Sequence, residues 1–223
     1  MKKIIFSTLA FAASLTMMGE GYQVNTLSVK QEGMGHTGVA QKLGAESMIF
    51  NPAGMAFMDK TLDLSAGVTA IFSEATALHE GTKYETNNDA STPFQISGAF
   101  SIFDNLKAGV TINTPYGSGI DWSDNWPGAV LSQSVKLQVF NIQPTVAYKI
   151  LPNLSVGAGL MIAWGSIDLN KGLVNAETFD KVLALNKVPA EYYFNGTTPA
   201  SVNLKGNAEV AVGFNVGAMW DIN

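Results

Sequence analysis

Apolar and polar side chains alternate with a period of two along most of the chain after residue 61. Leu62, Leu64 and Ala66, for example, alternate with Asp63 and Ser65. The same pattern covers residues 62–72, 94–102, 106–113, 135–150, 154–164 and 207–220. Because successive side chains of a strand point to opposite faces, this alternation predicts six β-strands, each with one apolar face.

The segment 135–150 departs from simple alternation. From Val135 to Val139 the apolar residues occupy odd positions, whereas from Phe140 onward most of them occupy even positions. A change of parity predicts one extra residue in the strand, which is a β-bulge. Pro144 lies in the same segment and has no N–H to donate to a neighbouring strand. We therefore predict an irregular stretch of sheet between residues 139 and 144.

The connections between these segments alternate in length. Residues 103–105 and 151–153 read as tight turns, whereas residues 73–92, 116–134 and 168–206 read as long loops. Outer-membrane β-barrels have this pattern, with short turns facing the periplasm and long loops facing outside. A soluble β-sandwich also alternates, but long strands with many Gly and Ser residues opposite the apolar face disfavour it. The predicted fold is therefore all-β, a multi-pass transmembrane antiparallel β-barrel in the outer membrane of a Gram-negative bacterium.

The composition supports a protein in contact with membrane lipid. Hydrophobic residues make up 47% of the chain and charged residues 14%, whereas about a quarter of an ordinary globular domain is charged. No second long apolar run follows the N-terminal one, so the apolar surface must be covered without helical spans, as in a barrel. The net charge of −5 argues against a nucleic-acid partner.

Residues 1–20 have the form of a secretory signal peptide. Lys2 and Lys3 precede an uncharged, largely apolar stretch from Ile4 to Met18. An N-terminal anchor helix is the alternative, but the stretch contains several hydroxyl side chains and is shorter than the roughly 20 apolar residues of a membrane span.

Residues 21–60 do not alternate. The segment is rich in glycine and has room for short helical turns, for example over residues 38–46. It lies between the signal peptide and the first predicted strand, so we expect a compact plug, or hatch, inside the lumen of the barrel.

Several motifs resemble the FadL family of outer-membrane transporters. They are the start Gly21-Tyr22-Gln23-Val24-Asn25, the pair Gly33 and Gly35, the tripeptide Asn51-Pro52-Ala53 before the first strand, and the stretches 109–117 and 153–164. The resemblance covers essentially the whole chain. Asn-Pro alone is a common turn opener, so the position of the tripeptide, just before alternating strands, carries the comparison.

The resemblance implies a fourteen-stranded barrel with a hatch in its lumen. Residues 21–60 would be the hatch, and residues 61–223 the N-terminal part of the barrel. Six strands cannot close a barrel of that size, so we expect a partial chain. The implied function is passive transport of long-chain fatty acids or similar hydrophobic molecules, captured in extracellular loops and released laterally when the hatch moves. Asn51, Pro52 and Ala53 would belong to the hatch or gate, and no cofactor is expected.

The loop 116–134 carries the best candidates for ligand capture. Its apolar side chains at Ile120, Trp122, Trp126 and Leu131 would form an exposed cluster, and such clusters often mark contact sites. The alternative is that these side chains only fold over the mouth of the barrel or contact lipopolysaccharide.

A fatty-acid carboxylate needs a positive partner. All 13 basic residues are lysines, so bidentate arginine contacts are excluded. Lys136, which we expect on the inward parity of its strand, and Lys171 are the candidates, with an ordinary solvated role as the alternative. The absence of arginine also leaves open a neutral ligand, such as an aromatic hydrocarbon.

Other classes of function fit less well. The two histidines, His36 and His79, fall in the predicted hatch and in an outer loop, away from any inward serine, so we predict no enzyme. The same separation and the lack of cysteine predict no metal site. A structural or adhesive barrel remains an alternative, although it would need no hatch.

Overall fold

The computed structural model of the chain describes residues 22–122 and 125–222. The predicted signal peptide, residues 1–20, lies outside the described residues. None of the helices in the described part combines the length and hydropathy that a membrane-crossing helix needs.

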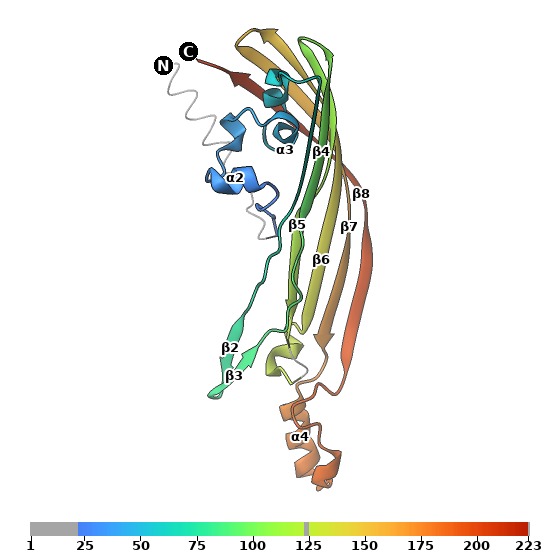
Figure 1. Ribbon diagram of the computed structural model, residues 1–223. Helices are drawn as coiled ribbons and strands as arrows, with labels where there is room; N and C mark the ends of the chain where they lie inside the picture. Colours follow the sequence, from blue (N-terminus) through green and yellow to red (C-terminus); the bar gives the residue numbers. More distant parts are fainter. Residues whose placement is uncertain (1–21, 123–124, 223) are drawn as a thin grey trace, which may run out of the picture.

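The predicted strands form one antiparallel sheet with the order β1-β4-β5-β6-β7-β8. Their bounds are β1 Leu62–Val68, β4 Phe94–Phe103, β5 Leu106–Asp121, β6 Ser134–Leu151, β7 Leu154–Gly172 and β8 Ser201–Trp220. The sheet is long and curved, like a section of a barrel wall (Figure 1). β5, β7 and β8 extend further toward the long loops than the alternation predicts, and β1 ends earlier.

Two elements in the long loops were not predicted. A separate hairpin, β2 (Thr76–His79) and β3 (Thr82–Glu85), stands beyond the end of β1, and helix α4 (Ala176–Leu185) lies between β7 and β8. Two 3-10 helices, η4 (Pro127–Val130) and η5 (Ala190–Tyr192), complete the loops. The hairpin and α4 lie at the end of the sheet opposite to the tight turns (Figure 1).

The segment before β1, called the hatch segment below (residues 22–60), forms short helices. These are α2 Val29–Gly33, η1 Gly38–Ala40, η2 Gly44–Glu46, α3 Ser47–Phe50 and η3 Pro52–Phe57. They lie on the concave side of the sheet, near the tight turns (Figure 1). The hydrophobic core lies between hatch segment and wall and contains Ala45, Met48, Met55, Ala56, Met58, Ala99 and Ala147.

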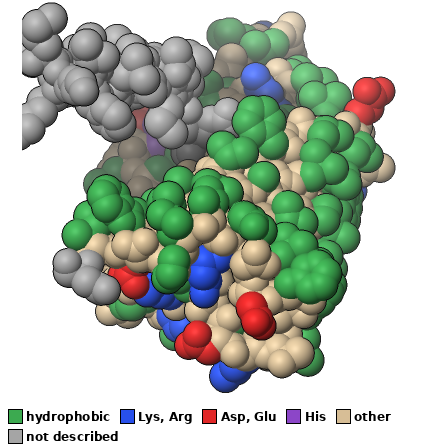
Figure 2. Space-filling model, turned by 90° about the horizontal axis from the view of Figure 1, so that it is seen from above, with side chains coloured by type: hydrophobic (Ala, Val, Ile, Leu, Met, Phe, Trp, Pro, Cys, Tyr) green, Lys and Arg blue, Asp and Glu red, His purple; other side chains and the backbone are tan. Residues whose placement is uncertain are grey.

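The wall has two unlike faces where the hatch segment covers it. The inner face buries polar side chains at Gln95, Ser97, Thr111, Asn113, Asn141, Gln143, Thr145 and Ser155. The outward face exposes large apolar ones, such as Phe100, Val146 and Phe214. Seen from the end with the tight turns, hydrophobic side chains spread over much of the visible surface and charged ones are sparse (Figure 2). An apolar outward face is what contact with lipid requires.

The irregularity predicted in residues 139–144 lies mainly on the neighbouring strand. β6 pairs with β7 in one register from Ser134 to Lys149, so the predicted bulge in β6 is wrong. The register shift falls on β5 at Thr114 and Pro115, between the pairs Asn113–Asn141 and Tyr116–Val139. The prediction for Pro144 holds, because β6 and β7 leave Gln143 and Pro144 out of their pairing.

The parity change in β6 has another cause, an exchange of polarity between the two faces. Val135, Leu137 and Val139 continue the inner face of Asn141, because β6 has no extra residue relative to β7. Toward the long loops the inner face is therefore apolar, and the outward face becomes polar with Gln138 and Lys136. The sequence shows where the apolar residues change parity, but it does not show that β6 continues without a bulge at that point.

Aromatic side chains mark the level of this exchange. Phe140 lies 6.1 Å from Trp164 and 6.4 Å from Phe94 between ring centroids. We call the height of these three residues on the wall the aromatic level. Positions above it lie toward the long loops, and positions below it lie toward the tight turns. Below the aromatic level, the outward apolar run on β7 reaches from Leu154 to Trp164. At about 3.3 Å per residue and a tilt of about 40°, this run corresponds to roughly 25 Å, the height of the apolar band of a transmembrane barrel.

Gly157 sets how closely the hatch segment approaches the wall. A Cβ at this position would lie 2.5 Å from the carbonyl carbon of Pro52 and 2.6 Å from the nitrogen of Ala53, both backbone atoms.

We expect Gly157→Ala to push the hatch segment away from the wall and to lower the free energy of unfolding by about 1–3 kcal/mol. Gly213→Ala is the control, because its nearest neighbour would lie at 3.9 Å. Thermal unfolding in detergent and proteolysis of the hatch segment measure the effect; equal behaviour of the two variants would contradict it.

Candidate functional site

The tripeptide Asn51-Pro52-Ala53 joins the hatch segment to the wall. The Asn51 side chain accepts a hydrogen bond from the Ala53 N–H at 3.1 Å and so caps η3. Its amide nitrogen donates to the carbonyl of Val39 at 2.8 Å and to that of Ala218, on β8, at 3.2 Å. Pro52 occupies the first position of η3, where its missing N–H costs nothing. This side chain thus begins η3, contacts η1 at Val39 and contacts the wall at β8.

Side chains of the wall donate hydrogen bonds to the backbone of the hatch segment. The carbonyl of Met48 accepts from Gln143 at 2.7 Å and from Asn215 at 3.2 Å. The carbonyl of Ala53 accepts from Ser155 at 2.9 Å. These donors come from β6, β8 and β7, so three neighbouring strands donate to carbonyls of α3 and η3. The polar residues on the inner parity are the signal that could have identified these contacts in the sequence.

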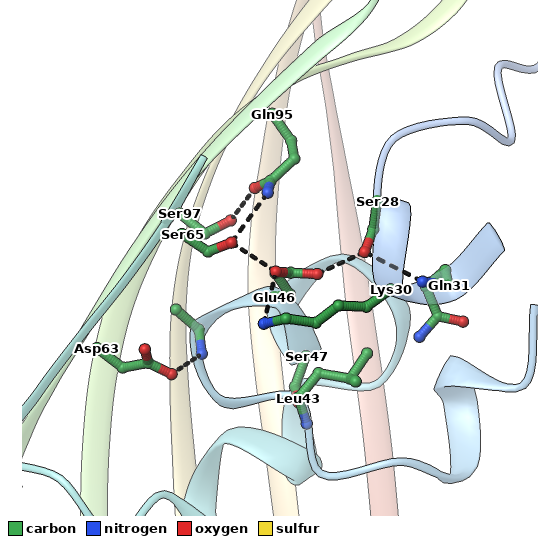
Figure 3. A network of polar contacts seen from close by, with 11 residues as sticks. Ser28, Lys30, Gln31, Leu43, Glu46, Ser47, Asp63, Ser65, Gln95 and Ser97 are labelled. Carbon is green, nitrogen blue, oxygen red and sulfur yellow. Dashed lines mark hydrogen bonds and ion pairs between the residues drawn. The ribbon is translucent and has the colours of Figure 1, made fainter. Parts of the chain in front are cut away.

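Glu46 is the charged centre of the contact between the hatch segment and β1 (Figure 3). Its carboxylate is buried, with 3% of the residue exposed. It accepts hydrogen bonds from the hydroxyls of Ser28 and Ser65 and pairs with Lys30 at 3.0 Å. Gln95 donates to the Ser65 hydroxyl at 3.2 Å and so extends the network to β4. No pattern in the sequence marks Glu46 as part of this contact.

The surroundings of Glu46 favour its charged form. Burial by itself raises the pKa of the Glu46 carboxyl, but the hydrogen bonds from Ser28 and Ser65 and the hydrogen bond and charge of Lys30 outweigh it, so the pKa lies below its ordinary value. The hatch segment is therefore held to β1 by an ionised group that has lost most of its contact with water.

The first described residues of the hatch segment pair with the wall at the β5 irregularity. Gln23 forms an isolated antiparallel bridge with Tyr116. The N–H of Val24 donates to the carbonyl of Pro115 at 2.9 Å, and the N–H of Gly117 donates to the carbonyl of Tyr22 at 2.9 Å. The backbone of residues 22–24 thus satisfies groups of β5 next to its register shift.

The long loops enclose a second feature, a cavity of about 430 Å³. It is lined by the β2–β3 hairpin, by the region of η4, by α4 and by the chain after α4. The Asn175 side chain caps α4 and donates to the carbonyl of Pro127 at 3.0 Å, which ties α4 to η4. Apolar and aromatic lining residues include Tyr84, Trp126, Ala129, Val130, Val174 and Tyr193.

The four predicted capture residues divide between the cavity and its surroundings. Trp126 lines the cavity, stacks on Trp122 with ring centroids 4.3 Å apart, and meets Tyr84 edge-on at 5.5 Å. Ile120 pairs with Val135 and so shares the inner face of the wall. Leu131 follows η4 and is 79% exposed. The structure therefore brings the two tryptophans together beside the cavity.

The inner face between this cavity and the hatch segment is apolar. Above the aromatic level it carries Tyr116, Ile120, Val135, Leu137, Val139, Ile167 and Leu169. Ala129, which lines the cavity, lies against the end of β7 at Gly172. Apolar contact surface therefore extends from the mouth of the sheet toward the hatch segment.

The two candidate lysines lie on opposite faces. Lys136 pairs with Asp168 across β6 and β7 and faces outward, so the expectation that it lies on the inward parity is wrong. The error follows from assigning apolar residues to the outward face along the whole strand. Lys171 shares the parity of Leu169 on the inner face and is exposed.

Three exposed side chains at the cavity rim could share a cation. Potential ligand atoms of His79, Glu80 and Glu177 lie within 4.8 Å of one another. Lys181 already pairs with the Glu177 carboxylate and lowers the pKa of that group. The lysine charge opposes cation binding here.

Comparisons with known proteins agree with the geometry. Residues 9–223 match the family described as outer membrane protein transport protein (OMPP1/FadL/TodX). Outer membrane protein P1 of Haemophilus influenzae is 23% identical, with 100% of this chain and 56% of that protein covered. The long-chain fatty acid transport protein of Escherichia coli O6:H1 is 25% identical, with 100% and 53% covered. The chain thus spans about half the length of these relatives.

Two solved structures have the same fold. A Pseudomonas aeruginosa FadL homologue superposes with a TM-score of 0.63 and 17% identity, covering 92% of this chain and 50% of that one. The Pseudomonas putida toluene transporter TodX superposes with a TM-score of 0.59 and 18% identity, covering 92% and 53%.

The Glu46 network predicts that docking of the hatch segment depends on pH. Because the pKa of Glu46 is lower in the folded protein than its ordinary value of 4.5, its contribution to stability is present above pH 4.5 and is lost as the pH falls through the folded pKa. We expect Glu46→Gln to remove this dependence and to lower stability by roughly 1.5–3 kcal/mol near neutral pH.

Thermal unfolding of both proteins between pH 3 and pH 7 measures the effect. Glu32→Gln, which changes an exposed glutamate of α2, is the matched control and should keep the pH dependence. A wild-type protein whose stability does not change over this range would contradict the assignment.

Proposed function

The chain belongs to the outer membrane protein transport protein (OMPP1/FadL/TodX) family, and from this premise we propose that it serves the passive uptake of hydrophobic molecules across the outer membrane. Its relatives are named as outer membrane proteins and as transporters, and the chain is an outer-membrane protein with part of their β-barrel.

The observation that carries the proposal is the apolar inner face above the aromatic level. A water-filled pore would need no apolar lining, because lumen-facing residues of membrane barrels are normally polar. Here Leu137 and Ile167, paired across β6 and β7, face inward, and Ile167 is 42% exposed. Contact with such surface stabilises a hydrophobic molecule by about 25 cal/mol per Å² of apolar area removed from water. A ligand captured beside Trp122 and Trp126 could therefore move inward without an energy source.

The gate in this proposal lies at the β5 irregularity. Residues 22–24 of the hatch segment provide the partners of Pro115 and Gly117 in β5. If these residues withdraw, backbone groups beside a register shift lose their hydrogen bonds, and the wall becomes easiest to deform at that point. We infer lateral release there, with Asn51, Pro52 and Ala53 holding the rest of the hatch segment on β7 and β8.

A neutral ligand is a second candidate, favoured by the placement of the lysines. Lys136 faces outward, which leaves Lys171 as the predicted carboxylate partner still on the inner face. A fatty acid would place its carboxylate near Lys171. An aromatic hydrocarbon would need no such partner and would use the apolar face alone.

A pair of inward substitutions tests the path. We expect Leu137→Asn with Ile167→Asn to reduce uptake of both a fluorescent long-chain fatty acid and toluene by at least tenfold, because each removes about 1.5–3 kcal/mol of apolar contact from the lining. Uptake is measured in cells that make equal amounts of each variant in the outer membrane.

The outward pair Gln138→Asn with Ser166→Asn is the control, because these residues pair at the next position of the same strands. It should take up both ligands as the wild type does. A folded inward variant with unchanged uptake, or a wild type that takes up neither ligand, would favour a structural or adhesive barrel.

Lys171→Gln separates the two ligand classes. Removing the ammonium group should weaken uptake of the fatty acid about twofold to fivefold, the effect of roughly one charge contact near a surface, and leave toluene uptake unchanged. Lys187→Gln, an exposed loop lysine, is the control. Equal uptake of fatty acid by both variants would leave Lys171 without a role in recognising the carboxylate.

A further inference from the structure

The outward face above the aromatic level carries a patch of hydrogen-bond donors and charges. Its side chains come from β6, β7 and β8 and are Lys136, Gln138, Ser166, Asp168, Asn203 and Lys205. We call these six residues the outer polar patch. Below the aromatic level the outward side chains of the same strands are almost all apolar, so the patch begins where contact with acyl chains ends.

Contacts within the patch leave positive charge available. Lys205 pairs with the Asp168 carboxylate at 2.9 Å, and Asn203 donates to its other oxygen at 2.8 Å. Lys136 lies opposite Asp168 on the neighbouring strand and is exposed. The side chain of Lys205 is 70% exposed. Two lysines therefore flank one acid, with amides beside them, and the patch favours anions that also offer hydroxyl or carbonyl acceptors.

A groove lies on the same outward face below the aromatic level. It has a volume of about 720 Å³ and is lined by small and apolar residues, among them Gly98, Phe100, Val110, Pro144, Val146 and Leu160. Pro144, where the β6–β7 pairing is interrupted, lies in its lining. The groove is open to the lipid side of the wall, so an acyl chain can enter it from the membrane.

The distance between the outer polar patch and the groove matches the distance between the headgroup and the acyl chains of one lipid molecule. On β6, Phe140 lies midway between Lys136 and Pro144. At about 3.3 Å per residue the two ends are roughly 26 Å apart along the strand, or roughly 20 Å along the membrane normal at a tilt of about 40°. The lining of the groove, which includes Pro144 and Val146 on β6, then lies roughly 10–15 Å below the aromatic level, near the middle of the apolar band. An acyl chain that extends inward from the leaflet on the side of the long loops reaches this depth.

We propose that this surface binds the phosphorylated, acylated disaccharide of lipopolysaccharide, lipid A, in the outer leaflet. Phosphate contacts Lys136 and Lys205, sugar oxygens accept from Gln138 and Asn203, and one acyl chain lies in the groove. A glycolipid fits better than a phospholipid, because the patch spans three strands and combines separated lysines with amide donors. The proposal does not depend on what the barrel transports.

Binding of purified lipid A to the detergent-solubilised protein tests the headgroup contacts. The variant with Lys136→Gln and Lys205→Gln should bind lipid A about 10- to 30-fold more weakly, because each lysine contributes roughly one charge contact to an anionic lipid. The charge-matched control, Lys60→Gln with Lys187→Gln, changes exposed lysines elsewhere and should bind as the wild type does.

A second pair of variants tests the groove. Ala158→Leu fills part of it, since Ala158 belongs to its lining. Ala218→Leu adds the same bulk to an outward position on β8, outside that lining. We expect Ala158→Leu to weaken binding of lipid A but not of its deacylated headgroup, and Ala218→Leu to affect neither.

Binding of phosphatidylglycerol and of inorganic phosphate shows whether the surface recognises lipid A or any phosphate group. The wild type should bind phosphatidylglycerol at least tenfold more weakly than lipid A and should show no saturable binding of inorganic phosphate in the same range. Equal affinity for phosphatidylglycerol, or unchanged lipid A binding after both lysines are replaced, would overturn the proposal.

Discussion

The exchange of polarity between the two faces of the wall is the constraint on which the rest of the structure depends. Lipid requires an apolar outward face over roughly 25 Å, and the run from Leu154 to Trp164 meets that requirement. Within this band the inner face is polar and is covered by the hatch segment. Beyond Phe140 lipid no longer dictates the outward face, so Lys136 and Gln138 can face outward and the inner face can become apolar.

The hatch segment is held by polar contacts because its helices are too short to hold themselves. Each short helix leaves most of its backbone groups without partners inside the helix. Gln143, Asn215 and Ser155 provide donors for carbonyls, and Asn51 provides a cap. Hydrogen bonds of this kind hold the segment in one place, while the small core around Met48 contributes modest apolar burial. A segment fixed mainly by directional contacts can leave as a unit when a few of them are lost.

The six strands could be predicted because alternation is a local property of the sequence. The hairpin β2–β3 and helix α4 were not predicted, because these elements are short and carry no long periodic pattern. The parity change at Phe140 was visible, but its cause was not: a bulge and an exchange of faces produce the same sequence pattern. The inward position expected for Lys136 failed for that reason. Glu46 was missed because one acid in a glycine-rich segment gives no sign of burial.

The bulge on β5 and the exchange of faces occur at one level, and this coincidence has a physical reason. A strand that keeps its register must place alternate residues on alternate faces, so β5 can change which residues face inward only by an extra residue, at Thr114 and Pro115. That residue leaves backbone groups to be satisfied, and residues 22–24 of the hatch segment satisfy them. The same feature that turns Tyr116 and Ile120 into the apolar lining thus ties that lining to the hatch segment. For this reason, the binding of a ligand to the apolar lining and the position of the hatch segment are coupled.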